Sequence, residues 1–391
     1  MDILIVAFAR GGALADYLSQ LSGAASGTND VTVMVPNYVE VEKFPRGVGI
    51  LRFPFPSNIF SAILQTFNPF LLKSLTHEVN RISPDVVHMA FEPRFPFPFA
   101  WLLHRKYPVV MTIHEPKPLP VEAIRIFLLN RIQVMDNKLL IKFSDKVIVH
   151  GESHRRYLLV RKVPSYKVEV VPHGDFSFYT QYQRSDIKPL KSGNILFFGR
   201  IVSYKGLDYL IEANKLIKEH IPDVTITIAG EGGFTKYEKL IGKDKNFVIL
   251  NRFIPDEEVA ELFGKASLVV LPYIAGTQSG VITIAGAFKK PVVATDVGNF
   301  SEMVENGQTG LIVPPGNANA LAEAIIKLLR DDKLREEMGE NAYRMVREKF
   351  SWNDIARKTF EVYKEAIKAR ERSTERKTDE TVGGYSRGDP V

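Results

Sequence analysis

Short, uninterrupted runs of apolar residues recur along this chain and are separated by segments long enough to form helices. Runs that are apolar at nearly every position indicate strands buried on both faces, as in a parallel sheet covered by helices. In the first half of the chain these runs are residues 3–7, 31–35, 85–89, 109–113 and 146–150. After a polar stretch, a second series follows at residues 194–198, 224–229, 247–250, 268–272 and 292–295. The pattern therefore predicts two α/β domains, each built on a parallel sheet.

Composition agrees with this prediction and excludes several classes of protein. The 391 residues are too many for one ordinary core, and 45% hydrophobic with 25% charged residues argues against global disorder. The absence of cysteine excludes disulfide scaffolds, thiolate zinc sites and cysteine nucleophiles, while the redox compartment stays undetermined. A net charge of +6 is too small to indicate a nucleic-acid binder, but it is compatible with phosphorylated small molecules or acidic lipid surfaces as partners.

The sequence carries no signal for secretion or for membrane insertion. Residues 2–7 have no basic segment before them, so they are expected to form a buried first strand rather than a secretory signal. No stretch reaches the roughly 18–20 uninterrupted apolar residues that a spanning helix needs. We therefore expect a cytoplasmic protein, with peripheral association at the inner membrane face left open.

Local composition marks three unusual stretches. Two of them, residues 53–56 and 95–101, alternate phenylalanine and proline, and their prolines favour irregular backbone over helix. Packed loops that border a ligand cleft are the simpler interpretation, and a lipid-contacting face is the alternative. Residues 371–391 are polar and charged, so we expect them to be disordered.

The segment 198–206, Phe-Gly-Arg-Ile-Val-Ser-Tyr-Lys-Gly, joins a predicted strand to a predicted helix. Arg200 and Lys205 bring a guanidinium and an ammonium to the helix start, where backbone amides also point outward. This combination suits a diphosphate. Two solvated surface charges are the alternative, and the segment alone does not separate the two interpretations.

A second strand–helix junction, residues 273–284, is rich in small and hydroxyl-bearing residues. Its backbone amides can hold a phosphate, although Ser279 can instead cap the helix. Gly11 and Gly12 follow the first strand in a similar way and allow a ligand to approach the backbone closely. They lack the Gly-x-Gly-x-x-Gly spacing of a dinucleotide-binding loop.

Four of the eight histidines stand at predicted strand ends or in loops of the first half, namely His88, His114, His150 and His173. A single histidine in such a place is more often structural than catalytic. Because four are expected near one cleft, we interpret them as hydrogen-bond partners of a polar ligand. They lack the helical His-x-x-x-His spacing of a zinc site, and nucleophile-elbow, Walker A and EF-hand motifs are also absent.

Four motifs cluster between residues 194 and 315. They are Phe-Phe-Gly-Arg at 197–200 with Lys205-Gly206, Ile-Ala-Gly-Glu-Gly at 228–232, Pro-Val-Val-Ala-Thr-Asp-Val-Gly at 291–298, and Gly-Gln-Thr-Gly-Leu-Ile-Val-Pro at 307–314. Together they resemble the motifs of the retaining nucleotide-sugar glycosyltransferases of family four, the large GT-B group. Asp-Val-Val-His at 85–88 and Val-Val-Pro-His-Gly at 170–174 are weaker echoes in the first half.

The resemblance implies a GT-B fold, in which two Rossmann-like domains with parallel sheets face a central cleft and the donor binds mainly to the second domain. We expect an acceptor-side domain at 1–185 and a nucleotide-sugar-binding domain at 190–350. A helix at 351–370 would then cross back to the first domain, before a disordered tail at 371–391.

The resemblance also implies roles for individual residues. The expected catalytic residues are Arg200 and Lys205, which would hold the donor diphosphate, and His114, which would lie near the transferred sugar. The expected donor-binding residues are Gly11, Gly12, Gly199, Gly230, Glu231, Phe253, Ile254, Thr277, Gln278, Ser279, Gly280 and Val281. His88, His150 and His173 are expected on the acceptor side. No metal or other cofactor is expected, because cations and a helix dipole would neutralise the departing diphosphate.

One departure from the family pattern concerns two carboxylates. Most members carry two glutamates, separated by seven residues, just before the Pro-Val-Val-Ala-Thr strand. The corresponding positions here are Gly276 and Ile284. Either Thr277, Gln278, Ser279 and the local amides replace these glutamates, or the protein has lost transfer activity. We favour replacement, because positioning and electrostatics supply most of the catalysis in such transfers.

The sequence therefore predicts a glycosyltransferase that moves a sugar from a nucleoside diphosphate sugar to an acceptor hydroxyl, with retention of configuration, in polysaccharide or glycolipid biosynthesis. The acceptor would be a glycan or a polyprenyl-linked lipid. Contact with an anionic membrane is a further expectation, and nucleic acid is not expected as a partner. The alternatives are a non-catalytic nucleotide-sugar- or glycan-binding subunit and a sugar-nucleotide epimerase of the same fold.

Overall fold

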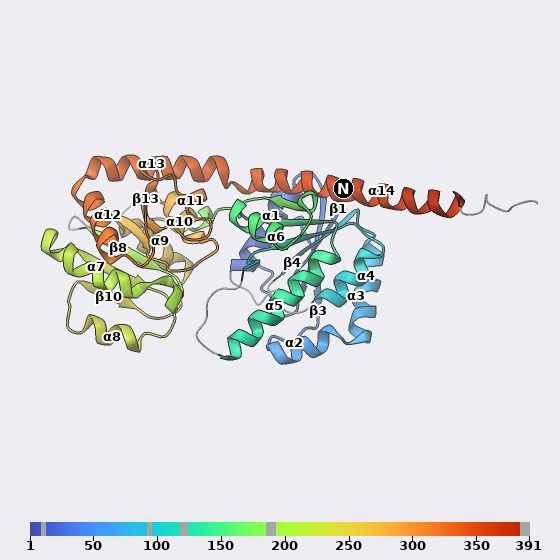
Figure 1. Ribbon diagram of the computed structural model, residues 1–391, viewed down its shortest axis with the longest axis horizontal. Coiled ribbons are helices and arrows are strands. Elements are labelled where there is room, and N and C mark those ends of the chain that lie inside the picture. The colour runs from blue at the N-terminus through green and yellow to red at the C-terminus, as the bar shows by residue number, and fades with distance from the viewer. Residues whose placement is uncertain (9–12, 92–95, 118–123, 185–192, 384–391) are drawn as a thin grey trace, which may run out of the picture. The chain divides into compact units, whose positions relative to one another are not determined.

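The computed structural model describes residues 1–8, 13–91, 96–117, 124–184 and 193–383. It contains two compact units, each an α/β layer structure (Figure 1). Unit 1 comprises Met1–Pro118, Ile124–Gly174 and Trp352–Val391, and the main span of unit 2 is Asp175–Ser351. The predicted fold class, two Rossmann-like domains with parallel sheets, is confirmed.

Unit 1 is built on a parallel sheet with the strand order β3-β2-β1-β4-β5-β6-β7 in its described part. Its strands are β1 Asp2–Val6, β2 Asp30–Pro36, β3 Gly49–Phe53, β4 Val86–Phe91, β5 Val109–Ile113, β6 Lys146–Val149 and β7 Val168–Val170. The chain moves from β1 outward to β3 and then returns to β4 on the other side of β1. This reversal makes β1 and β4 the switch point of the sheet, where open α/β sheets usually bind ligands.

Helices cover both faces of this sheet. They are α1 Ala13–Ser26, α2 Ile59–Thr66, α3 Pro69–Ile82, α4 Phe97–His104, α5 Ile124–Lys142, α6 Glu152–Val160, the 3₁₀ helix η1 Ser165–Lys167, and α14 Trp352–Gly383. Successive residues of β1 point to opposite faces, so Ile3 and Ile5 pack in the core with α1 and α14. Leu4 and Val6 pack in the other core, with α3 and α4. The apolar character of residues 3–6 in β1 therefore follows from burial on both sides.

Unit 2 has a second parallel sheet, with the order β10-β9-β8-β11-β12-β13 in its described part. The strands are β8 Asn194–Phe198, β9 Thr225–Ala229, β10 Phe247–Leu250, β11 Leu268–Leu271, β12 Val292–Thr295 and β13 Gly310–Val313. The helices are η2 Ser177–Tyr182, η3 Ser203–Lys205, α7 Leu207–His220, α8 Thr235–Ile241, α9 Asp256–Lys265, α10 Gly280–Ala287, α11 Phe300–Met303, α12 Ala318–Arg330 and α13 Asp332–Lys349. Separate apolar cores fill the two faces of the sheet.

The second phenylalanine–proline stretch is helical, contrary to the sequence expectation. Residues 97–104 form α4, with Pro98 in its first turn. Proline is tolerated there, because the first amides of a helix have no partner within the helix that the ring could remove. Phe99 and Leu103, one turn apart, are buried against the sheet and hold this short helix in place.

Two further expectations differ from the structure near the ends of the predicted domains. The units divide between Gly174 and Asp175 rather than at residue 185, because η2 packs on α9 and α10 of unit 2. The expected disorder from residue 371 is also wrong as far as Gly383, where α14 ends. Residues 384–391 lie outside the described part of the chain. Within the described residues, no helix combines the length and apolar character needed to cross a bilayer.

Candidate functional site

The carboxyl ends of β8 and β11 lie side by side in the sheet of unit 2, because these two strands pair in parallel. The sheet order places β9 on one side of β8 and β11 on the other, so this is the switch point of the sheet. Ligands of open α/β sheets bind beyond the strand ends at such a point. The two loops that the sequence singled out leave the sheet here.

The loop after β8, residues 199–206, is called the cationic loop below because it carries Arg200 and Lys205. It ends in η3 and passes directly into α7, whose first amides receive no side-chain cap from the described residues. Gly206 has a φ of 65°, and a Cβ here would lie 1.9 Å from the carbonyl oxygen of Pro272. Only glycine fits this backbone and this close approach.

Contacts with the loop after β11 fix the shape of the cationic loop. The carbonyl oxygen of Tyr204 accepts hydrogen bonds from the amides of Ile274, at 2.9 Å, and Ala275, at 3.4 Å. The Lys205 ammonium lies over the ring of Tyr273, 5.1 Å from its centre. Arg200 is exposed. The structure therefore brings Lys205 to the loop that precedes α10, on a loop that also carries the exposed Arg200.

The loop before α10 buries polar groups that have no protein partner in the described structure. Thr277 is only 3% exposed, and its Oγ1 accepts and donates no hydrogen bond there. The Tyr273 hydroxyl is also buried and also makes no hydrogen bond with the described residues. Ser279 occupies the N-cap position of α10, but its side chain makes no capping bond, so the capping alternative is not observed. A polar anionic ligand would supply hydrogen bonds to these buried hydroxyls and a negative charge for the cations of the cationic loop.

Other predicted donor-binding residues converge on the same strand ends. Gly230 follows β9, and a Cβ there would lie 2.2 Å from the carbonyl oxygen of Gly199, so both glycines permit a close backbone crossing. The carbonyl oxygen of Glu231 accepts a hydrogen bond from the Ile201 amide at 2.8 Å, while the residue itself is exposed. The structure thus places these backbone segments beside the cationic loop.

The remaining predicted donor-binding residues differ in their exposure. Phe253 is 74% exposed, whereas Ile254 and Val281 are buried in an apolar core. Ile254 and Val281 can therefore reach a ligand only through their backbone groups. Gln278 is half-buried in the loop before α10, and Gly280 is the first residue of α10.

The two positions that lack the family glutamates have different surroundings. A Cβ on Gly276 would make ordinary contacts, at 3.5 Å from the Tyr273 ring and 3.6 Å from Val297. Ile284 is 4% exposed and packs in the apolar core of α10. A side chain is therefore sterically possible at position 276, whereas the side chain at position 284 is part of the apolar core.

A second polar group of side chains lies at the carboxyl edge of the sheet in unit 1. His114 follows β5, His150 follows β6, and His173 follows β7 by three residues. Together with Tyr17 of α1 and Trp352 of α14 they form what we call the histidine cluster. The centre of the Tyr17 ring lies 4.9 Å from the ring centre of His114, 5.1 Å from that of His173 and 5.4 Å from that of Trp352. The ring centres of His114 and His150 are 4.8 Å apart.

Burial keeps these imidazoles neutral at ordinary pH. It lowers the pKa of His114 to about 3, with the neighbouring His173 as a further cause, and the pKa of His173 to about 4. The pKa of His150 is also lowered well below its usual value by burial and by His114. Burial raises the pKa of Tyr17 to about 12, so its hydroxyl stays protonated.

The hydrogen bonds of neutral His150 determine the tautomer of His114. The carbonyl oxygen of Val171 can only accept, so His150 donates to it from Nδ1, at 2.9 Å. His150 Nε2 then carries a lone pair and accepts from Nδ1 of His114, also at 2.9 Å. His114 Nε2 is left as an acceptor that has no partner among the described residues. The cluster thus presents one lone pair suited to a ligand hydroxyl.

His88 is not part of this arrangement, and the expectation that it faces a ligand is wrong. It lies within β4 rather than at the strand end, and it is fully buried. Its Nδ1 bonds to the hydroxyl of Tyr363 in α14, and its Nε2 bonds to the hydroxyl of Thr112 in β5, both at 2.7 Å. His88 therefore ties α14 to the sheet.

Sequence reasoning missed the two aromatic members of the histidine cluster. Tyr17 stands on the apolar face of α1 with Leu14, Leu18 and Leu21, a helical spacing that sequence can reveal. That spacing indicates burial but not which side chains lie opposite. Trp352 gives no comparable signal. The predicted glycines at positions 11 and 12 lie outside the described residues.

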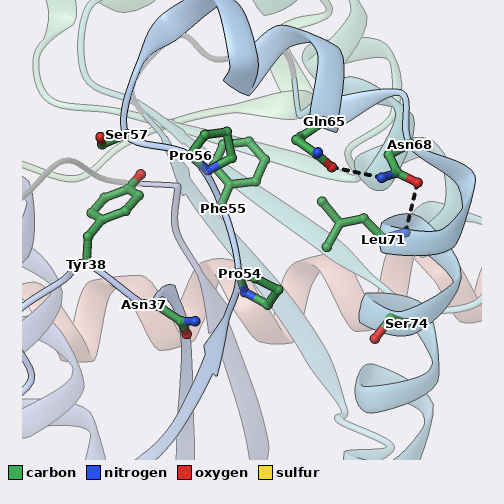
Figure 2. A pocket seen from close by; sticks show the side chains of 10 residues that line it. All are labelled: Asn37, Tyr38, Pro54, Phe55, Pro56, Ser57, Gln65, Asn68, Leu71 and Ser74. Atoms are coloured by element: carbon green, nitrogen blue, oxygen red, sulfur yellow. Dashed lines mark hydrogen bonds between the residues drawn. The ribbon is translucent and has the colours of Figure 1, made fainter.

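A cavity of about 830 Å³ with a mainly apolar surface opens at the ends of β2 and β3 in unit 1 (Figure 2). Prolines, phenylalanine and leucine form its apolar surface, and amides and hydroxyls supply its polar atoms. The lining residues are Asn37, Tyr38, Pro54, Phe55, Pro56, Ser57, Gln65, Asn68, Leu71 and Ser74. The amide of Asn68 donates to Gln65 at 2.8 Å, and its oxygen accepts from the Leu71 amide. None of the ten described residues that line this cavity carries a formal charge, so its described surface suits an uncharged polyhydroxyl ligand.

The described residues contain no group of three or more histidine, aspartate or glutamate side chains arranged to hold a metal ion. The histidine cluster is not an exception, because Nδ1 of His114 and Nε2 of His150 are engaged with each other.

Comparison with known protein families matches each unit to a glycosyltransferase family model. A family model described as Glycosyl transferases group 1 matches residues 180–345, and one described as Glycosyltransferase Family 4 matches residues 15–174. The two matched regions follow each other along the chain and lie almost entirely within unit 2 and unit 1, respectively.

Individual relatives match over about half of their own length. An alpha-D-kanosaminyltransferase of Streptomyces kanamyceticus is 33% identical over 174 residues, which are 44% of this chain and 45% of that protein. A phosphatidyl-myo-inositol mannosyltransferase of Mycobacterium leprae is 30% identical over 177 residues, 45% of this chain and 47% of that protein. The chain thus spans about half the length of these relatives.

Solved structures share the fold of this protein over almost its whole chain. The structure of HepE from Anabaena in complex with UDP covers 93% of this chain and 99% of its own, with a TM-score of 0.70 and 18% sequence identity. At that identity the likeness concerns the fold alone.

Proposed function

This chain belongs to the group 1 glycosyltransferases of family 4, and on that premise we propose that it transfers a sugar from a nucleoside diphosphate sugar to an acceptor hydroxyl with retention of configuration. The C1–phosphate oxygen bond of the donor breaks, and the acceptor oxygen forms the new bond to C1. The proton of the acceptor hydroxyl leaves with the diphosphate. The residues of this chain would position the two reactants and stabilise the charge that develops.

The observation that carries this proposal is the joining of the cationic loop to the loop before α10. Bond breaking builds negative charge on the departing diphosphate, and Arg200, Lys205 and the amides at the start of α10 are the groups in unit 2 that would receive it. The guanidinium can bind two phosphate oxygens at once, while the ammonium acts as a point charge. With these groups in place, the proposed transfer needs no metal ion or other cofactor.

His114 would orient the transferred sugar. Its Nε2 carries a lone pair that the His150 contact leaves free to accept a hydrogen bond from a sugar hydroxyl. The low pKa of His114 keeps this lone pair available at all physiological pH values. His114 would therefore act as a neutral acceptor rather than as an acid, with His150 and His173 as its supports.

For the acceptor we propose a glycan or a polyprenyl-linked sugar, bound through its uncharged polyol part in the cavity of Figure 2. Amide side chains that bond to hydroxyls, beside apolar surfaces that cover the C–H faces of a sugar ring, support this choice. In this proposal the protein works in polysaccharide or glycolipid biosynthesis, in the cytoplasm and at the inner face of the membrane. A relative named for phosphatidyl-myo-inositol is consistent with such a role.

Incubation with a panel of UDP-, GDP- and ADP-sugars tests the proposal. One donor should raise the melting temperature, because a ligand that binds only the folded state stabilises it, and should be consumed slowly in the presence of simple glycosides. NMR of the product should show the anomeric configuration of the donor. An inverted product would refute retention, and a donor changed in stereochemistry but not transferred would identify an epimerase.

A second candidate, a non-catalytic nucleotide-sugar-binding subunit, is favoured by one observation. Position 284 holds a buried isoleucine in place of the second family glutamate. In the same panel this candidate predicts stabilisation by a nucleotide sugar with no consumption of any donor, which would overturn the transferase proposal.

A further inference from the structure

Large apolar side chains are exposed together on α2, α3 and α4 of unit 1. The exposed fractions are 76% for Leu64, 53% for Phe67, 83% for Phe70 and 44% for Trp101. The three helices follow one another in packing contact, α2 with α3 and α3 with α4 (Figure 1). Isolated exposed apolar residues are normal on a protein surface, but a group on adjoining helices marks an interaction face.

The packing between these helices makes the face continuous. Phe67 at the end of α2 stacks edge-on with Phe97 at the start of α4, with 5.6 Å between ring centres. A cavity of about 600 Å³ lies between α3 and α4. Pro69, Leu72, Trp101 and Leu102 supply its apolar lining. Trp101, one of the four exposed residues, therefore borders a recess whose lining is partly apolar.

The charges on this face are mostly positive. Exposed Lys73, Arg105 and Lys106 have no acidic neighbour in residues 57–82 or 96–107 except Glu78, which is paired with Arg81 at 2.8 Å. The Arg105 guanidinium lies over the Trp101 ring, 5.2 Å from its centre. An aromatic ring beside a cation is the combination that places a side chain at the boundary between lipid tails and headgroups.

We infer that this face, which we call the α2–α4 face, docks on an anionic lipid surface. Phe70 and Leu64 would insert among the acyl chains, and the three cations would contact lipid phosphates. Apolar residues at the tip with cations beside them fit a charged bilayer better than a second copy of the same chain, because the cations of two copies would repel each other.

Helices α2 and α3 contribute residues both to the α2–α4 face and to the cavity of Figure 2. Gln65, Asn68 and Leu71 line that cavity, while their sequence neighbours Leu64, Phe67 and Phe70 are exposed. A lipid-linked sugar at the membrane surface would thus be close to the cavity. This second point, unlike the docking itself, rests on the proposed function.

Vesicle flotation tests the docking. The intact chain should float with vesicles of phosphatidylcholine and phosphatidylglycerol, and much less with phosphatidylcholine alone. The double variant Leu64→Ser/Phe70→Ser should lower the bound fraction by roughly tenfold or more, because each side chain contributes apolar area to insertion. The matched control is Val160→Ser/Tyr166→Ser, which changes two residues of unit 1 that are 79% and 73% exposed outside this face. The control should float like the unchanged chain.

Three results would overturn the inference. They are the absence of flotation, equal loss in both variants, and a concentration-dependent dimer that Leu64→Ser/Phe70→Ser disrupts while flotation persists. Donor consumption with a water-soluble glycoside separates this inference from the proposed function, because neither variant touches the residues assigned to the donor. Flotation without donor consumption would support the docking and refute the proposed enzyme activity. Donor consumption without flotation would support the enzyme activity and refute the docking.

Discussion

The cationic loop of unit 2 and the histidine cluster of unit 1 both lie at the carboxyl edge of a parallel sheet, but they follow different strands and have opposite chemistry. The cationic loop follows the central strand β8, whereas the histidines follow β5, β6 and β7, on one side of their sheet. The cationic loop presents an exposed arginine and a half-exposed lysine on a backbone shaped by glycines. The histidine cluster is aromatic and neutral, and burial suppresses the charge on its imidazoles. One edge is suited to a phosphate anion, and the other to the hydroxyls of an uncharged sugar.

The difference shows that the fold provides the edge and the loops provide the chemistry. Gly206 and Gly230 allow backbones to cross closely, which leaves room at the surface for cations and amides. In unit 1, the rings of Tyr17 and Trp352 pack against the histidine cluster and help to bury its imidazoles. If this division is correct, changes at the two edges should have separable effects.

The largest effect is expected from Arg200→Ala. Loss of a charge-stabilising group at the diphosphate should lower kcat/KM by roughly 10²–10³-fold. The melting temperature should stay within the small range of surface substitutions, because Arg200 is exposed. Arg347→Ala on α13 is the matched control, since it removes another exposed arginine of unit 2. Near-normal transfer by Arg200→Ala would refute the role of the cationic loop.

Acid should destabilise unit 1 selectively. His88, His114 and His173 have folded-state pKa values of about 3, 3 and 4, against 6.5 for the unfolded chain. Below about pH 6.5 only the unfolded chain takes up these protons, so stability falls as pH decreases toward 4. His88 alone should contribute a loss of about 2 kcal/mol at pH 5.

Tryptophan fluorescence can measure this loss in unit 1 alone, because Trp101 and Trp352 both belong to that unit. Unit 2 contains only one histidine, His220, so its secondary structure should persist at a pH where the fluorescence reports unfolding. His220→Gln should leave the acid transition unchanged. A midpoint of urea unfolding, followed by this fluorescence, that is the same at about pH 7.5 and pH 5 would contradict the assignment of neutral, buried histidines.

Replacing His114 and His88 should separate a ligand contact from a structural one. His114→Gln should lower kcat about tenfold, since the acceptor for the sugar hydroxyl is altered, and it should also lower the melting temperature somewhat, because the hydrogen bond from His114 to His150 is changed. His88→Leu should instead lower the stability by about 2 kcal/mol with kcat unchanged at low temperature, because it leaves Tyr363 and Thr112 without their partner. Equal loss of turnover in both would mean that the two histidines act together.

The smallest effect is expected from Gly276→Glu, which restores the first family carboxylate. A Cβ at this position has ordinary contact distances to Tyr273 and Val297, so the backbone there has room for a side chain and the fold should tolerate the substitution. The KM for the donor should fall by about threefold through one added hydrogen bond. Ile284→Glu is the contrasting variant and should unfold unit 2 readily, because it buries a charge in an apolar core. A tolerated Ile284→Glu with a lower KM would show that this pocket accepts the family arrangement.

Much of the fold could be predicted from local sequence. The strands at 109–113, 194–198, 247–250 and 292–295 are observed with the predicted bounds. Burial explains the apolar runs of β5, β8 and β12, whereas β10 at the edge of its sheet is apolar although largely exposed. The strand-end positions of Arg200 and Lys205 were predictable for the same reason. Their contact with Tyr204 and Tyr273 was not, since it depends on how two loops of different strands pack.

The incorrect predictions share a physical cause. His88 was predicted to lie near a strand end because the apolar run ends at residue 89, but β4 continues to Phe91. Its partner Tyr363 lies 275 positions away along the chain, beyond any local pattern. Residues 97–104 were expected to be irregular from their prolines, but burial of Phe99 and Leu103 favours the helix. Tertiary packing decided each of these cases.

The division of unit 1 into chain segments has a consequence for its biosynthesis. Helix α14 supplies Tyr363 to His88 and Glu365 to Lys146, and it follows all of unit 2 in the sequence. On the ribosome, unit 2 is therefore complete before unit 1 receives its last helix. Until then the apolar groove for α14 stays open in the nascent chain, which exposes unit 1 to aggregation or to chaperones. Unit 2, at 175–351, is accordingly the half to express alone.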